Sequence, residues 1–274
     1  MGNLRHSDIK TTPYLLAFMY TKIQKTPYDP IFTPRFYLPN STVAGIEVSL
    51  KYGQRILTSS EAFRLIQSGN AHGLLEQIKQ QLDKWQSVVE GPLYVTWEVC
   101  GKTTQNDLKQ FLDELGLVLP LNRLEIVFDS HEIPADRALM HIKALIESLP
   151  DSRIRKGLFH SRPLELIPDE LDGLIDLLKL RKGVIMEIKE DLVTATQCHE
   201  LIENLVKRKI EIVVDDLYSK SDVTWAILMG VKYGQGYFLS RNHTPQKAIK
   251  TLKKKPGSDF YERRIDFIQD IAWA

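Results

Sequence analysis

Short runs of apolar, β-branched residues recur along the chain and alternate with longer segments whose apolar positions repeat at helical spacing. The later runs start roughly thirty residues apart, which is the length of one strand–helix–strand unit. These runs predict strands at 44–50, 93–97, 123–128, 154–159, 184–189 and 210–214. The longer segments predict helices at 106–115, 134–149, 170–180 and 196–207, and a further helix that carries Val223, Ala226 and Ile227.

Local signals support several of these helix ends. Gly116 follows the first predicted helix, and Pro134 occupies the first helical position of the second. Ser219 stands three residues before Asp222, which is the spacing of a capping box at the start of the last helix. Each helix is therefore expected to be a discrete element between two strands.

Six or seven strand–helix units in 274 residues predict an α/β fold, a single modified (β/α)8 TIM-type barrel. An open, doubly wound sheet with a similar number of strands is the alternative. Little periodicity and several prolines predict an N-terminal arm over residues 1–33, followed by the barrel over 34–255. Pro256 and Gly257 then stop a helix, and 256–274 is predicted to be a helical C-terminal extension.

Composition narrows the class of protein. A net charge of +1, with 43% hydrophobic and 26% charged residues, describes an ordinary globular domain and gives no electrostatic reason to expect a nucleic-acid or membrane partner. The two cysteines, Cys100 and Cys198, provide no disulfide framework and no zinc motif, so we expect a cytoplasmic protein without a cofactor. One dense basic run, Lys247 to Lys255, is either a site for an acidic partner or a solvated helix end.

The strand at 210–214 ends on two carboxylates, Asp215 and Asp216. The carboxyl ends of buried parallel strands are where α/β folds place their chemistry. The next predicted strand opens with Gly234, Gln235 and Gly236. Two isolated histidines, His131 and His160, also follow strands, but they have no partner at recognisable spacing and are interpreted as solvated or hydrogen-bonded side chains.

Several of these segments resemble the EAL domain family. The similar segments are VAGIEVSLKY from Val43, ILTSSEAFRLIQSGNAHGLL, LYVTWE, RLEIVFDS and, most specifically, IVVDDLYSKSDVTWAILMGVKYGQGYFLSR, and together they span Pro34 to Thr251. The resemblance implies a modified (β/α) barrel. It also implies descent from bacterial phosphodiesterases that cleave cyclic diguanylate with two divalent cations.

Four positions keep or conservatively change the side chains that the family uses. Glu47 matches the metal-binding glutamate of the name-giving motif, and Lys51 replaces its phosphate-facing arginine. Asp215 stands for a glutamate, and Gln235 retains the family glutamine. Lysine keeps the charge of arginine but loses its bidentate geometry.

Five other positions have lost the family's side chain. Thr96 stands for a metal-binding asparagine, and Val127 stands for a ligand glutamate that Asp129 could replace only if the strand shifts by two residues. Gly157 and Leu158 occupy the places of the paired aspartates. The catalytic lysine is matched by Glu187, with Met186 as the alternative.

These losses favour a catalytically inactive EAL-like regulatory protein, with no metal and no catalytic residue, that binds a protein partner of unknown identity in bacterial control of motility, adhesion or transcription. The partner is expected on the outer surface, at the basic run or at the aromatic residues of the arm, Tyr14, Phe18, Tyr20 and Tyr28. The first alternative is a receptor that binds cyclic diguanylate without cleaving it.

The second alternative is an enzyme with residual or altered chemistry, in which Glu47 and Asp215 act as general acid and base. An acidic cluster of Glu47, Glu98, Glu187 and Asp215 at the barrel mouth is also expected to attract one cation weakly. The sequence leaves the oligomeric state open.

Overall fold

The computed structural model describes residues 27–40, 42–69, 71–87, 89, 93–129, 135–149, 153–160, 167–180 and 183–239. Its strands are β1 (Tyr28–Tyr37), β2 (Thr42–Tyr52), β3 (Arg55–Ile56), β4 (Tyr94–Cys100), β5 (Leu124–Asp129), β6 (Arg155–His160), β7 (Leu177–Leu180), β8 (Glu211–Val214) and β9 (Tyr233–Gly234). Its α-helices are α2 (Ser59–Gln67), α3 (His72–Gln86), α4 (Gln105–Gly116), α5 (Ala135–Glu147), α6 (Val184–Glu190), α7 (Leu192–Lys207) and α8 (Lys220–Leu228).

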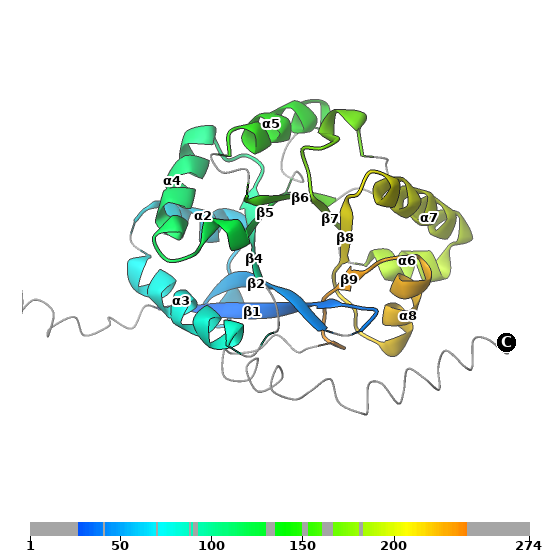
Figure 1. Ribbon diagram of the computed structural model, residues 1–274, viewed down its shortest axis with the longest axis horizontal. Coiled ribbons are helices and arrows are strands. Elements are labelled where there is room, and N and C mark those ends of the chain that lie inside the picture. The colour runs from blue at the N-terminus through cyan, green and yellow to red at the C-terminus, as the bar shows by residue number, and fades with distance from the viewer. Residues whose placement is uncertain are drawn as a thin grey trace, which may run out of the picture.

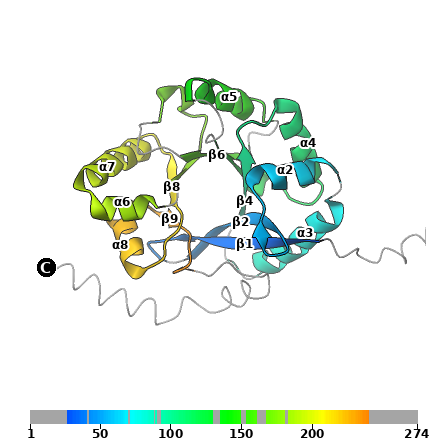
Figure 2. The ribbon, with the colours of Figure 1, turned by 180° about the vertical axis from the view of Figure 1, so that it is seen from behind.

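Eight of the strands form a closed barrel, in the order β1, β2, β4, β5, β6, β7, β8, β9, and β1 pairs with both β2 and β9 to close it. Strand β1 is antiparallel to both neighbours, whereas the pairs from β2 through β9 around the rest of the ring are parallel. The short strand β3 pairs antiparallel with β2 outside the ring. Helices surround the ring of strands (Figures 1 and 2). The predicted TIM-type barrel is confirmed, with one strand reversed.

The reversed strand β1 was not predicted. Its residues run antiparallel to β2 from the pair Tyr28–Tyr52 to the pair Tyr37–Thr42, so the boundary expected at residue 34 lies inside a strand of the barrel wall. Pro30 and Pro34, which suggested an irregular arm, are part of this strand. Residues 1–26, the basic run and the C-terminal extension lie outside the described residues.

The prediction for residues 170–190 assigned the wrong type of element to two segments. The segment expected to be a helix at 170–180 contains a 3-10 turn at Asp169–Leu171 and then strand β7, whose four residues are all buried. The segment expected to be a strand at 184–189 is helix α6. A run of four residues such as β7, three of them leucines, is too short to show a period, and the β-branched residues of α6 imitate a strand while burying one helical face.

Aromatic side chains hold the helices against the outside of the barrel. Phe32 of β1 packs edge-on against Trp85 of α3 with ring centroids 4.5 Å apart. Phe111 of α4 lies 6.0 Å from Trp97 of β4 and 4.7 Å from Phe63 of α2, again between ring centroids. These contacts fix the positions of the strand ends. Within the described part of the chain, no helix is both long and apolar enough to cross a membrane.

Candidate functional site

A lysine and three carboxylates meet at the carboxyl ends of the parallel strands. The Nζ atom of Lys179 on β7 lies 2.6 Å from Glu47 Oε2, 2.6 Å from Glu98 Oε1 and 3.3 Å from Asp215 Oδ2. These carboxylates come from β2, from β4 and from the residue that follows β8. We call Glu47, Glu98, Lys179 and Asp215 the mouth cluster. The fold thus joins residues 132 positions apart in the sequence.

The lysine of the mouth cluster is buried, with only 2% of its surface exposed. Burial by itself lowers the pKa of Lys179, but the charges of Glu47, Asp215 and Glu98 outweigh it and raise that pKa well above its usual range. Burial raises the pKa of Glu47, and its neighbours Glu98 and Asp215 add to the effect, while Lys179 opposes it. Lys179 is therefore a fixed positive charge that compensates the carboxylates around it.

Two further side chains complete the mouth. Gln235 donates a hydrogen bond from Nε2 to Glu47 Oε2 over 2.7 Å. Gln235 lies directly after β9, so this hydrogen bond joins the first and the last of the sequence segments that resemble the EAL domain family. Lys51 lies further along β2, where its Nζ atom is 3.5 Å from Asp29 Oδ2 and it takes no part in the mouth cluster. Asp216 has a positive φ of 59°, and its amide donates to the side chain of Asp215.

The barrel interior below the mouth cluster is apolar. Val127, Leu177 and Val213 form a separate buried cluster of side chains, and we call these three residues the apolar plug. Gly157 stands beside Val127 and Leu177 in the register of the sheet. A Cβ atom at Gly157 would lie 2.9 Å from both Leu177 Cγ and Val127 Cγ2, so the plug occupies the space that a longer side chain would need.

The remaining positions expected to have lost a ligand serve the structure. The Thr96 hydroxyl donates a hydrogen bond to Glu125 Oε1 over 2.7 Å, so the Thr96 side chain is already engaged within the protein. Leu158 belongs to the main hydrophobic core, packed with the outward-facing side of the sheet. Asp129 is the last residue of β5. His131 and the side chain of His160 lie outside the described residues.

The match of Glu187 to the family's catalytic lysine was wrong. That match assumed a strand at 184–189, but Glu187 lies on helix α6 and does not join the mouth cluster. The strand that follows β6 around the barrel is β7, and it carries Lys179. One signal could have located it, because Lys179 is the single charged residue in an otherwise apolar run, and a buried charge requires partners.

The side chains of the mouth do not fit two divalent cations. Hard cations take six or more oxygen ligands, and a two-metal site needs such ligands around both ions. Val127, Gly157 and Leu158 bring no side-chain oxygen, and Thr96 is engaged with Glu125. Among the described residues, no group of three or more His, Cys, Asp or Glu side chains is arranged to hold a metal ion.

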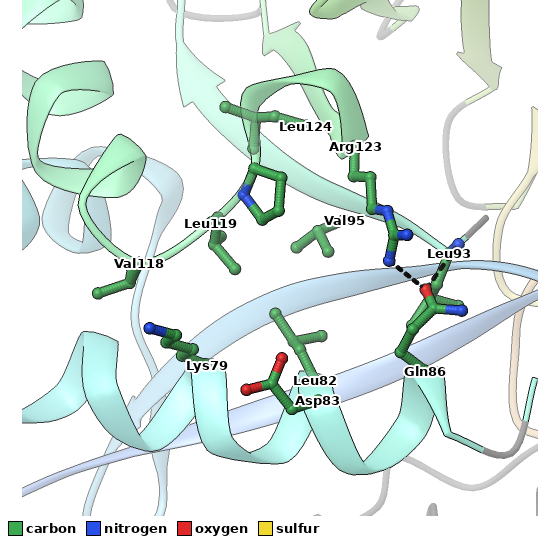
Figure 3. A pocket seen from close by; sticks show the side chains of 11 residues that line it. Lys79, Leu82, Asp83, Gln86, Leu93, Val95, Val118, Leu119, Arg123 and Leu124 are labelled. Carbon is green, nitrogen blue, oxygen red and sulfur yellow. Dashed lines mark hydrogen bonds between the residues drawn. The ribbon is translucent and has the colours of Figure 1, made fainter.

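A small pocket of about 60 Å³, with mixed polar and apolar lining, lies outside the barrel, between α3 and the chain that enters β4 and β5 (Figure 3). Gln86 closes one side, since its Oε1 atom accepts hydrogen bonds from Arg123 and from the amide of Leu93. Aliphatic side chains such as Leu82 and Val118 line the rest, together with Lys79 and Asp83. The pocket is too small for more than a few atoms and is far from the chemistry of the mouth.

Comparison with known proteins identifies the architecture. No protein-family model matches the sequence, and no curated protein matches it either. Solved structures do match. The EAL enzyme Bd1971 in its cAMP and cyclic-di-GMP bound form has a TM-score of 0.65 at 14% identity, over 87% of this chain and 68% of that one. The EAL domain of Mycobacterium smegmatis DcpA has a TM-score of 0.62 at 12% identity, over 83% and 98%.

A third similar structure is the Xanthomonas citri FimX EAL domain in complex with c-diGMP, with a TM-score of 0.57 at 13% identity, over 82% of this chain and 91% of that one. At such identities the likeness shows the fold and leaves the chemistry to be argued from the side chains. The reversed first strand, the closed ring and the shared architecture lead to one conclusion. This chain has the fold of an EAL domain.

Proposed function

We propose that this protein is a noncatalytic EAL-type barrel that acts in bacterial signalling by binding another protein. The observation that supports this most directly is the mouth itself, where Lys179 already compensates Glu47, Glu98 and Asp215. Below it, the apolar plug with Gly157 fills the place where further oxygen ligands would be needed.

The apolar plug argues for lasting loss of the metal-dependent reaction. A single missing ligand could be replaced by water, but the interior at Val127 and Leu177 is closely packed hydrocarbon. Two cations and an activated water need a polar, hydrated space. A regulatory protein of this kind would keep the barrel as a scaffold and use its outer surface for contacts.

Activity measurements test the proposal. The full chain, incubated with cyclic diguanylate and either Mg²⁺ or Mn²⁺, should form no linear dinucleotide above the level of a buffer control. Glu47→Gln should leave that background unchanged. Metal-dependent turnover that disappears in Glu47→Gln would sink the proposal, because it would show a working site at the mouth.

A cyclic diguanylate receptor is the second candidate, and one feature favours it. Lys179 and Gln235 keep cationic and amide groups at a mouth whose solved structural neighbours include complexes with that dinucleotide. Against it, Lys179 is 2% exposed and fully engaged by carboxylates, which repel a dianion. Isothermal titration separates the two candidates, since micromolar binding that is lost in Gln235→Ala favours the receptor.

A further inference from the structure

A second polar site lies at the opposite end of the barrel from the mouth cluster. A cavity of about 480 Å³ is lined by the first residues of three parallel strands, Tyr94 of β4, Arg155 of β6 and Glu211 of β8. Arg35 also lines it, because β1 runs antiparallel and places its later residues at this end. We call this space the basal cavity. The apolar plug separates it from the mouth.

Two arginines of the basal cavity are held in place by one buried carboxylate. Glu125 is fully buried and receives hydrogen bonds from Arg35 Nη1 at 2.5 Å and Nη2 at 3.1 Å. Arg155 Nη1 lies 3.2 Å from the same carboxylate, and its Nη2 atom donates to Glu211 over 2.8 Å. Tyr94 lies against the Arg155 guanidinium, 4.7 Å from ring centroid to Cζ. The positions of both guanidinium groups are therefore fixed before any ligand arrives.

Two carboxylates, Asp176 and Glu211, line the basal cavity beside its cations, and each has a partner within the protein. The Asp176 carboxylate accepts a hydrogen bond from the amide of Lys156 over 2.8 Å. Glu125 lies beneath the arginines with no exposed surface, and Glu211 is paired with Arg155. In contrast, Arg35 Nε is buried and has no hydrogen-bond partner among the described residues, although the side chain is only 4% exposed. A buried donor left unpaired is costly, so this end of the barrel holds one unsatisfied buried donor beside the engaged guanidinium nitrogens.

The rim of the basal cavity adds a strained cation. Lys209 lies two residues after the last residue of helix α7 and has a positive φ of 61°. The hydrogen bonds from its own amide to Val206 and from the amide of Ile210 to Leu205 form a Schellman motif. Glycine is the residue that this position favours, and a side chain there is strained. Within the described ranges Lys209 has no ion pair, so its charge is available at the cavity that it lines.

We propose that the basal cavity binds a small oxyanion, a phosphate or carboxylate group, between Lys209 and the guanidinium groups of Arg35 and Arg155. The charge of Lys209 attracts the anion to the rim, and the fixed guanidinium groups supply directed N–H donors. The site is independent of the mouth cluster and of the proposed partner binding. It gives the barrel a second ligand class at the end where such folds normally carry stabilising contacts alone.

The test titrates inorganic phosphate, and separately acetate, into the full chain at an ionic strength held constant with sodium chloride. Phosphate should raise the melting temperature above the chloride control, because a ligand of the native state stabilises it. Acetate alone raising it would assign a carboxylate ligand. No shift with either anion beyond the chloride control would overturn the proposal.

Substitutions at Lys209 then locate the site. Lys209→Gly and Lys209→Asn should melt no lower than the unmutated protein without anion, because both residues accept a positive φ, and each should weaken anion affinity about tenfold. Lys207→Ala removes the same charge from an exposed position two residues away and should bind normally. Unchanged affinity in both Lys209 variants, or anion binding that is lost in Glu47→Gln at the mouth, would refute the assignment.

Discussion

Val127 on β5 and Gly157 on β6 are direct neighbours in the sheet, and a Cβ atom at position 157 would lie 2.9 Å from Val127 Cγ2. The absence of a side chain at Gly157 and the bulky aliphatic side chain of Val127 thus belong to one packing arrangement. The interior of the barrel at these two positions is filled by hydrocarbon contacts. This arrangement and the ion pairs at both ends of the barrel lead to four predictions.

Gly157→Asp, which introduces a carboxylate, should destabilise the fold by about 3–5 kcal/mol in urea unfolding, because it overpacks the plug and buries an uncompensated charge. Gly116→Ala is the matched control, since a Cβ there meets Leu121 Cδ2 at an ordinary 3.7 Å, and it should change stability by less than about 1 kcal/mol. The role of Val127 is tested with two further variants, Gly157→Ala and the double variant Gly157→Ala with Val127→Ala. If the double variant is no more stable than Gly157→Ala, the clash with Val127 is not the cause of the lost stability.

Lys179→Met should cost about 3–5 kcal/mol of unfolding free energy near neutral pH, because it leaves three carboxylates close together without their cation. Removing the lysine takes away the charge that lowers the pKa of Glu47, so that pKa rises further above its unfolded value. A raised carboxyl pKa destabilises the fold above the unfolded pKa, so this part of the loss should shrink as the pH falls through the raised folded pKa and be absent below the unfolded value of about 4.5.

The partly exposed pair of Lys189 with Asp222, 2.5 Å apart, provides the control for Lys179→Met. Lys189→Met should cost no more than about 1 kcal/mol, because solvent screens this pair. Chemical unfolding curves recorded from pH 4 to pH 8 measure both effects. Equal losses for the two lysines, or a loss at Lys179 that does not change with pH, would contradict the charge argument.

Glu125→Gln should weaken the fold by about 3–5 kcal/mol at neutral pH, because Arg35 and Arg155 then lack their shared buried anion. Burial alone raises the pKa of Glu125, but the two arginines lower it below the usual value. A depressed carboxyl pKa contributes stability above the unfolded value near 4.5, and that stability disappears as the pH falls through the folded pKa.

The measurement for Glu125 is the midpoint of acid unfolding, followed by circular dichroism. The variant should have lost stability at pH 7 yet show a shallower decline below pH 4.5 than the unmutated protein. Glu190→Gln, on the exposed end of α6, should reproduce the unmutated profile. A Glu125→Gln profile that runs parallel to that of the unmutated protein would show that Glu125 does not carry this pH dependence.

Magnesium and manganese at low millimolar concentration should leave the melting temperature of the unmutated protein unchanged, because a cation must displace the Lys179 ammonium to reach the carboxylates. Glu47→Gln and Asp215→Asn should be equally insensitive. Differential scanning calorimetry measures this directly. A metal-dependent rise of several degrees in the unmutated protein, abolished in both variants, would reveal a cation site at the mouth.

The sequence by itself determined the class of fold and most of its elements. Apolar strands followed by amphipathic helices predicted a barrel, and the capping pair Ser219 and Asp222 correctly marked the start of α8. The resemblance to the EAL domain family grouped Glu47, Asp215 and Gln235, and the structure brings these three side chains together around Lys179 and Glu47. These features depend on local periodicity and on the resemblance of segments along the chain.

Only the tertiary structure decided the rest. Strand β1 is defined by its pairing with β2 and β9, and β7 was mistaken for part of a helix because a run of four residues is too short to show a period. Lys179 was therefore missed as a site residue, and its role depends on carboxylates up to 132 positions away in the sequence. The same holds for the basal cavity, where Arg35 and Glu125 meet across 90 positions. Pairings between distant segments arise from closure of the barrel, and no local pattern of residues encodes them.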